Sequence, residues 1–445
     1  MPLPAMVRMR QTFPRPRVED LDAALAEEWA KEGIGSSVKP GMEVAITAGS
    51  RGVARIDEIV AALVRLVKDA GATPFIVPAM GSHGGATAEG QVEILRSLGV
   101  TEEACGAPIR SSMEVVELGE TPRGVRVFMD RNAHGSDGVI VVNRVKAHTD
   151  FRGPVESGLM KMSAIGLGKH AQALALHALG VTGIRDHMVE VARHVAGSGK
   201  LLFGVASVEN GYEEPAIVEA IRPEAFEERE GALLEEWMRL MPRLPVEDVD
   251  VLVVDRIGKN YSGTGMDTNV IGRFRLVGVD EPASPRVKYL VACDISEESH
   301  GNATGIGLAD LTTRRLFDQI DWQAMNENVL TSTFLERAKV PMVRAHDREA
   351  VEAAVRCNWG VAVEDTRLVR VPNTLHLEYA DVAEPLVEEA EANGAERVNG
   401  AEPLPFGSDG VLAPFGAEEQ DGSRRDPWGE VDGAAAGREA PEPAR

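Results

Sequence analysis

The order of apolar and amphipathic segments between residues 42 and 78 restricts the fold more than any other feature of the chain. Residues 42–47 and 73–78 are short apolar runs of the kind that form buried strands. Between them, residues 55–70 place apolar side chains at helical spacing on one side. Two strands joined through a helix usually pair in parallel, with a right-handed crossover. We therefore predict an α/β fold.

The same alternation continues along the chain and predicts two domains. A chain of 445 residues is too long for one ordinary core. Pro242 and Pro245 mark a boundary before a second strand-and-loop series. We expect two α/β domains, with mixed and mostly parallel sheets and a cleft between them. The predicted divisions are an N-terminal domain over residues 1–245, a C-terminal domain over residues 246–398, and a disordered acidic tail over residues 399–445.

Composition excludes several classes of protein. The net charge of −23 argues against nucleic acids and anionic membranes as partners. The chain has no apolar run long enough to cross a bilayer, and its first residues lack the apolar centre of a signal peptide, so cytoplasmic residence is expected. Its three cysteines are scattered, which favours neither a zinc site nor a disulfide framework. P-loop and HExxH motifs are absent.

Two histidines are expected at the carboxyl ends of strands. His83 lies on a glycine-rich loop after the strand at residues 73–78, and His148 follows the apolar run at residues 138–142. Open α/β sheets bind their ligands at this end of the strands. Histidines on two neighbouring loops can face one substrate from opposite sides and handle a proton on either face. The alternative is that each imidazole only hydrogen-bonds within its own loop.

Lys161 and His177 form a second candidate pair. Lys161 lies between two methionines, and a partly buried lysine can act as a nucleophile or a covalent attachment point. The alternative is a lysine whose stem covers apolar surface. One straight helix would separate Lys161 from His177 by about 24 Å. We expect Gly166 and Gly168 to break the helix and bring the two together. Otherwise, His177 and His170 are a pair of surface histidines.

Two further groups of residues are candidates for binding. Ser50, Arg51 and the Gly84-Gly85 turn before a helix are predicted to contact a phosphate group. In the second domain, Lys259 and Tyr261 follow the strand at residues 249–254 on a polar, glycine-rich loop. Such a loop can orient a carboxylate, or it can be a solvated turn.

Taken together, these motifs resemble the nickel-dependent lactate racemase family, whose members carry a nickel-pincer nucleotide. The resemblance covers about residues 40–395 and is strongest in the N-terminal half. It rests on the glycine loop around His83, on His148 followed by the SGLMK sequence that ends at Lys161, and on His177 at the family's spacing.

The resemblance implies an N-terminal cofactor-binding domain and a role for each candidate. Lys161 would carry the cofactor covalently, and His177 would be the protein's ligand to nickel. His83 and His148 would be the acid–base groups of a racemase or epimerase that moves a hydride between a 2-hydroxy acid and the cofactor. Arg51 matches a loop where the family has an arginine near the cofactor or substrate. The other candidates for contacts to the cofactor or substrate are those named above from the residues themselves, namely Ser50, Gly84, Gly85, Lys259 and Tyr261.

The resemblance also implies partners, namely a small 2-hydroxy acid and the proteins that make the cofactor. The turn Ala48-Gly49-Ser50 lacks the acidic residue of the lactate-specific sequence, so another 2-hydroxy acid or a sugar acid epimerised at carbon 2 fits equally. Two other classes remain open. One is a metal-independent lyase or dehydratase using His83, His148 and Lys161. The other is a non-catalytic protein that binds a small acid or a nucleotide.

Overall fold

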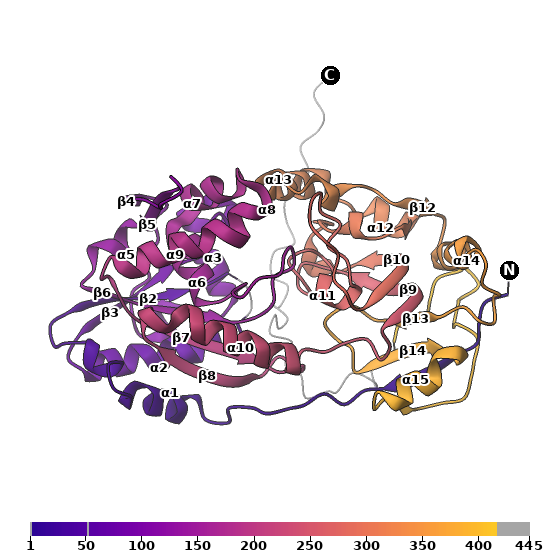
Figure 1. Cartoon of the computed structure of the whole chain (residues 1–445), viewed down its shortest axis with the longest axis horizontal. Coiled ribbons are helices and arrows are strands. Elements are labelled where there is room, and N and C mark those ends of the chain that lie inside the picture. The colour runs from indigo at the N-terminus through magenta and orange to yellow at the C-terminus, as the bar shows by residue number, and fades with distance from the viewer. Residues whose placement is uncertain (1, 51–52, 416–445) are drawn as a thin grey trace, which may run out of the picture.

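The computed structural model describes residues 2–50 and 53–415, and two α/β units lie side by side along its longest axis (Figure 1). The predicted α/β fold with mostly parallel sheets is confirmed. In the described ranges, no helix is long and apolar enough to cross a membrane.

The first unit is built on a five-stranded sheet in the order β3-β2-β6-β7-β8. The first four strands are parallel, and β8 is antiparallel to β7. The predicted strand at residues 73–78 is β3 without change. The strands are β2 (Glu43–Ala48), β3 (Thr73–Pro78), β6 (Gly138–Arg144), β7 (Leu201–Glu209) and β8 (Pro215–Ile221).

Helices cover both faces of this sheet, because alternate strand residues point to opposite sides. Val44 and Ile140 pack against α1 (Leu21–Ala30) and α2 (Ile56–Asp69) on one face. Their neighbours Ala45 and Val141 belong to the cluster on the other face. Besides the helical segment from residue 159 to residue 177, described below, this unit contains α3 (Ala88–Ser97), α4 (Glu102–Cys105), α5 (Arg131–Gly135), α8 (Gly180–Thr182), α9 (Met188–Gly197), α10 (Phe226–Leu240) and the hairpin β4–β5 (Val115–Glu120, Arg126–Asp130).

The second unit contains an eight-stranded sheet in the order β12-β11-β10-β9-β13-β14-β1-β15. Strands β12 to β13 are parallel, and the last three are antiparallel. Its strands are β1 (Met6–Arg10), β9 (Asp248–Ile257), β10 (Arg286–Ile295), β11 (Leu311–Thr313), β12 (Met342–Arg344), β13 (Leu368–Val371), β14 (Tyr379–Ala383) and β15 (Glu396–Arg397). Its helices are α11 (Thr268–Ile271), α12 (Arg314–Asp318), α13 (Trp322–Ser332), α14 (Asp347–Cys357) and α15 (Val387–Ala392).

Both ends of the described chain depart from the expected domain boundaries. Strand β1 (Met6–Arg10) pairs with β14 and so belongs to the second sheet, although residues 1–245 were expected to form one domain. Leu404 and Leu412 are buried against the second sheet, so the disorder expected from residue 399 does not hold for this part of the chain. The rest of the predicted tail, residues 416–445, lies outside the described residues.

Residues 159–177 form one succession of helical turns, consisting of α6 (Leu159–Lys161), a π-helical segment (Met162–Gly166) and α7 (Leu167–His177). The breaks expected at Gly166 and Gly168 are wrong, because the backbone leaves helical geometry at Lys169, with φ 55° and ψ −156°. Gly166 is helical, and a Cβ there would overlap Met162 Sδ and the Ala79 carbonyl oxygen. This glycine therefore allows close approach to the end of β3.

Candidate functional site

The loops that carry the predicted histidines lie at the carboxyl ends of the strands of the first sheet. Strands β3, β2 and β6 are parallel neighbours in that order, so their carboxyl ends lie together. His83 follows β3, Ser50 follows β2, and His148 follows β6. This is the edge at which open α/β sheets bind ligands.

His148 is held on three sides and is only 7% exposed. Its backbone N–H donates to Glu156 Oε2 at 2.6 Å. Its ring stacks on Phe151, with 4.5 Å between ring centroids. The backbone N–H of Asp150 donates to His148 Nδ1 at 3.2 Å, and Asp150 Oδ2 lies 3.6 Å from the same nitrogen. These contacts hold the Nδ1 side of the ring against Asp150, so that Nε2 points away from Asp150.

Lys161 meets His148 at that nitrogen, with 2.8 Å between Lys161 Nζ and His148 Nε2. The turn that carries Lys161 is supported from α10, because Glu230 Oε2 accepts the Met160 N–H at 2.9 Å. Glu230 is fully buried, and this burial raises its pKa to about 8. A Cβ at Gly158 would overlap the Glu230 carboxyl group, so glycine is required for this approach.

His177 interacts electrostatically with Lys161 and Asp150. Burial lowers the pKa of the His177 imidazole, Lys161 lowers it further, and Asp150 opposes the shift. Among the described residues, no hydrogen-bond partner reaches the buried His177 Nδ1. The result is a neutral imidazole with an unused nitrogen, which is the form that binds a transition metal.

His83 is supported by a buried polar cluster behind its loop. Ser50 Oγ contacts His83 Nδ1. Gln91 Nε2 donates to the carbonyl oxygens of Gly81 at 3.0 Å and of His83 at 3.3 Å. Lys169 Nζ in turn donates to Gln91 Oε1 at 2.9 Å. The backbone of the loop is therefore tied to α3 and, through Lys169, to α7.

Lys169 is fully buried, and its Nζ lies 3.2 Å from the buried carboxylate of Asp130. It also donates to the carbonyl oxygen of Pro78, the last residue of β3. Burial lowers the pKa of Lys169 and raises the pKa of Asp130, although each partner opposes the shift of the other. The pair is enclosed, with both side chains fully buried behind the His83 loop.

The predicted phosphate-binding residues are placed only in part. Gly84 and Gly85 have φ values of 68° and 63°, and they lead into the helix that Thr87 caps through its Oγ1. A Cβ at Gly84 would overlap the backbone of Gly90, so this turn lies directly against α3. Arg51 lies outside the described residues.

Lys259 and Tyr261 are placed on the second unit, at the end of β9. Lys259 Nζ donates to the Gly263 carbonyl oxygen at 2.7 Å and contacts Asn328 Oδ1. Tyr261 lies edge-on to His376, with 6.0 Å between ring centroids. Burial raises the pKa of the Tyr261 hydroxyl.

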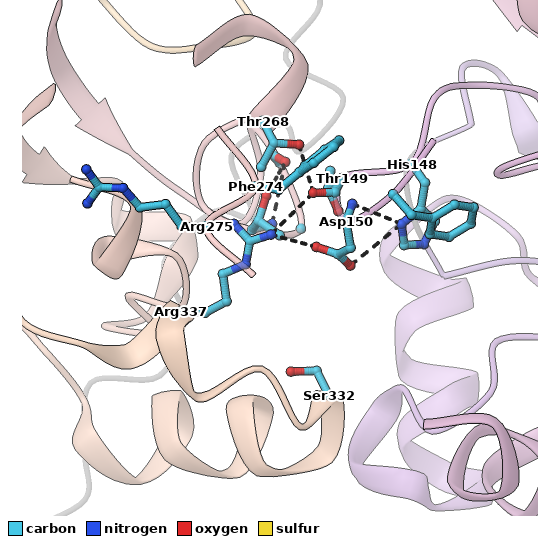
Figure 2. A network of polar contacts seen from close by, with 12 residues as sticks. His148, Thr149, Asp150, Thr268, Phe274, Arg275, Ser332 and Arg337 are labelled. Atoms are coloured by element: carbon cyan, nitrogen blue, oxygen red, sulfur yellow. Dashed lines mark hydrogen bonds and ion pairs between the residues drawn. The ribbon is translucent and has the colours of Figure 1, made fainter. Parts of the chain in front are cut away.

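Polar contacts join the two units beside His148 (Figure 2). Arg337 Nη2 donates to Asp150 Oδ1 at 2.8 Å and to the Thr149 carbonyl oxygen at 3.3 Å. Thr268 Oγ1 donates to the same carbonyl oxygen at 2.8 Å. Arg152 contacts Asn269, and its guanidinium lies over the ring of Phe274.

Comparison with known proteins finds a similar domain family for the N-terminal part of the chain. Residues 5–187 match the sequence profile of the lactate racemase N-terminal domain. Over these residues, the chain is similar to the lactate racemase family. The matched range contains His83, His148, Lys161 and His177, and the match ends before Lys259 and Tyr261. A search of curated proteins found no match.

The lactate racemase likeness extends to the fold of most of the chain. The lactate racemase apoprotein from Thermoanaerobacterium thermosaccharolyticum superposes with a TM-score of 0.51. The alignment covers 83% of this chain and 99% of that structure, with 11% sequence identity. At this identity the comparison establishes the shared fold.

Several residues around the lactate racemase-like site were missed from the sequence. Asp150 is two residues from His148, and that short spacing was an available signal. Glu230 and Arg337 are far from the motifs in sequence, whereas Gln91 is eight residues from His83, and no local pattern marks any of the three. Only the packing of α10, α3 and the 3₁₀ turn Leu335–Ala338 brings them in.

Proposed function

We propose that this protein racemises or epimerises a 2-hydroxy acid at carbon 2. The observation that carries the proposal is the gathering of Lys161, His148 and His177 beside the end of β6, with an unused imidazole nitrogen on His177. The match of residues 5–187 to the lactate racemase N-terminal domain supports the same reaction class. In this proposal, the first unit is the cofactor-binding domain.

The side chains fit the nickel-pincer nucleotide that the family resemblance implies. Lys161 would hold it covalently, and His177 would bind the nickel ion. Within residues 2–50 and 53–415, no three His, Cys, Asp or Glu side chains gather to form a metal site. A single imidazole ligand therefore suits a metal whose other donors belong to the cofactor. When bound, the cofactor supplies a reversible acceptor for the hydride on carbon 2.

The two histidines handle the proton of the substrate hydroxyl group. His148 presents Nε2 toward Lys161, and its ring is held by Phe151 and Asp150. Ser50 Oγ contacts His83 Nδ1, and Nε2 is the nitrogen that we assign to the substrate hydroxyl group. Each histidine would serve one enantiomer, taking the hydroxyl proton as a 2-keto acid forms and returning it afterwards.

The carboxylate of the substrate requires cationic or hydrogen-bonding partners. We assign Arg51, Lys259 and Tyr261 to this role, with Ser50, Gly84 and Gly85 near the cofactor. Lys259 and Tyr261 lie on the loop of the second unit that leads into α11, where Thr268 and Asn269 contact the first unit. The proteins that make the cofactor are the expected partners.

The proposal is tested by incubating enantiopure 2-hydroxy acids with protein co-expressed with the cofactor-making enzymes. Chiral chromatography should show formation of the mirror-image or epimeric acid. His83→Asn and His148→Asn should each lower the rate by about 10²–10⁴-fold, as expected for loss of an acid–base group. In D₂O, carbon 2 should keep its hydrogen, because a hydride that moves to a cofactor and back does not exchange with solvent.

Other outcomes would contradict the proposal. Turnover by metal-free protein with an unsaturated or keto product would indicate a lyase or dehydratase. Stabilisation by a small acid or nucleotide without turnover, in protein that carries nickel, would indicate a binding protein.

A further inference from the structure

Arg337 is a buried arginine of the second unit whose side chain hydrogen-bonds to residues of the first unit. It is 2% exposed, and the polar atoms that it contacts, Asp150 Oδ1 and the Thr149 carbonyl oxygen, both belong to the first unit. Its Nε and Nη1 have no hydrogen-bond partner among the described residues. A buried guanidinium with unused donors lowers stability relative to a satisfied one.

Arg370 shows the contrast within the same chain. It is also fully buried, but it binds Asp255 through both Nε and Nη2 and Asp381 through Nη1. Those three contacts stay within the second unit, where they join β13 to β9 and β14. The hydrogen bonds of Arg370 to these carboxylates are therefore made within its own unit. The guanidinium of Arg337 instead binds Asp150 of the other unit, whose carboxylate lies beside the ring of His148.

Asp150 connects Arg337 to His148 through opposite sides of one carboxylate. Oδ1 accepts the hydrogen bond from Arg337, and Oδ2 lies 3.6 Å from His148 Nδ1. The backbone N–H of Asp150 also donates to that nitrogen. The neutral ring therefore has the N–H as its partner at Nδ1, and the protonated ring has Oδ2. Both contacts depend on Asp150 staying where Arg337 holds it.

We infer that Arg337 is a positioning residue of the second unit that acts through Asp150 on the imidazole of His148. The inference rests on the proposed function, because it gives Arg337 a role in setting the acid–base group. Its consequence is that the orientation and proton position of His148 are set only when the second unit is docked on the first. Figure 2 shows Arg337 reaching from the second unit to Asp150, with His148 beyond it.

Thr268 provides a matched control. Its hydroxyl crosses between the units to the Thr149 carbonyl oxygen, as Arg337 does, but it has no described contact with Asp150. Thr268→Val removes one hydrogen bond between the units and preserves the shape of the side chain. Arg337→Met removes the contact to Asp150, and Asp150→Asn keeps the shape of Asp150 while removing its charge.

The test is the ¹⁵N spectrum of the histidine side chains in the full-length protein, with His148 assigned by its loss in His148→Gln. At one fixed pH, Arg337→Met and Asp150→Asn should shift or split the Nδ1 and Nε2 signals of His148, and Thr268→Val should leave them in place. Arg337→Lys, which can still reach one acceptor, should give an intermediate shift. Where turnover is measurable, Arg337→Met should lower kcat at least tenfold and change KM less than threefold.

The inference is wrong if the His148 signals of Arg337→Met overlay those of the parent protein. It is also wrong if Thr268→Val moves them equally, because the effect would then be general to docking of the units. Should Arg337→Met fail to fold, Arg337→Lys and Asp150→Asn decide by the same signals. The spectrum is independent of turnover, so an absence of racemase activity would overturn the proposed function without deciding this inference.

Discussion

At the residue scale, the site depends on charged side chains that have been removed from water. Lys169 combines full burial with a backbone conformation, φ 55° and ψ −156°, that L-residues rarely adopt. Its ammonium group links Asp130 to Gln91, and Gln91 holds the carbonyl oxygen of His83. The contacts of the buried ammonium group offset the strain of this conformation.

Lys169→Met should be strongly destabilising, since it leaves the Asp130 carboxylate buried without its cation. We expect a loss of about 3–5 kcal/mol in the free energy of unfolding, measured by urea denaturation. The double variant Lys169→Met/Asp130→Asn should recover a large part of that loss. A loss below about 1 kcal/mol for Lys169→Met, or strict additivity in the double variant, would show that the pair does not matter to stability.

Glu230→Gln should change the pH dependence of stability. The pKa of Glu230 is about 8 in the folded chain against an ordinary 4.5, so between these values the folded chain binds the proton more tightly than the unfolded chain. Its contribution is therefore complete below about pH 4.5 and is lost as pH rises to 8. The variant cannot titrate, so its Tm relative to the parent protein should increase steadily from pH 5 to pH 8. A difference in Tm that is independent of pH would contradict this.

At the scale of elements, the succession from α6 to α7 packs its glycines against neighbouring backbone. Gly166 leaves no room for a side chain, because Met162 Sδ and the carbonyl oxygen of Ala79 occupy the position of a Cβ. The same approach places Gly81, on the His83 loop, with its N–H 3.5 Å from the carbonyl oxygen of Gly166. The absence of a side chain at Gly166 therefore allows the segment that carries Lys161 to pack closely against the loop that carries His83.

Gly166→Ala should lower the free energy of unfolding by about 1–3 kcal/mol, because the added methyl group overpacks this contact. It should also impair the site, since the His83 loop must move. Gly197→Ala is the matched control, because Gly197 is in α9 and a Cβ there meets nothing within 4 Å. The control should be neutral or stabilising by up to about 1 kcal/mol. Equal effects of the two variants in urea denaturation would contradict this reading of Gly166.

At the scale of the whole molecule, the two units share a core and place the site where they meet. One cluster of buried residues runs from Val141 of the first sheet to Val254 of the second. Helices α7 and α13 meet between the units (Figure 1). Strand β1 lies in the second sheet, although the residues that follow it in the sequence form the first unit. These features favour one docked arrangement over two independent domains.

Features that depend on residues close together in the sequence could be predicted from it, and features that depend on residues far apart in the sequence could not. Strand β3, the helix after Thr87 and the parallel edge with His83 and His148 follow from local periodicity, caps and the crossover rule. The pairing of β1 with β14 and the contact of Arg337 with Asp150 join residues that are at least 187 positions apart, and no local pattern encodes them. The bend at Lys169 was missed because glycine is the usual residue at positive φ, whereas here a buried ion pair maintains it.

The central claim is that Lys161 carries the cofactor and His177 binds its metal, and intact mass tests it most directly. Full-length protein from cells that also express the cofactor-making enzymes should gain several hundred daltons and contain one nickel ion per chain. Peptide mapping should place the added mass on Lys161, and Lys161→Arg should lack it. His177→Gln should retain the added mass but bind nickel more weakly. Folded protein with an unmodified Lys161 and no nickel would contradict the account.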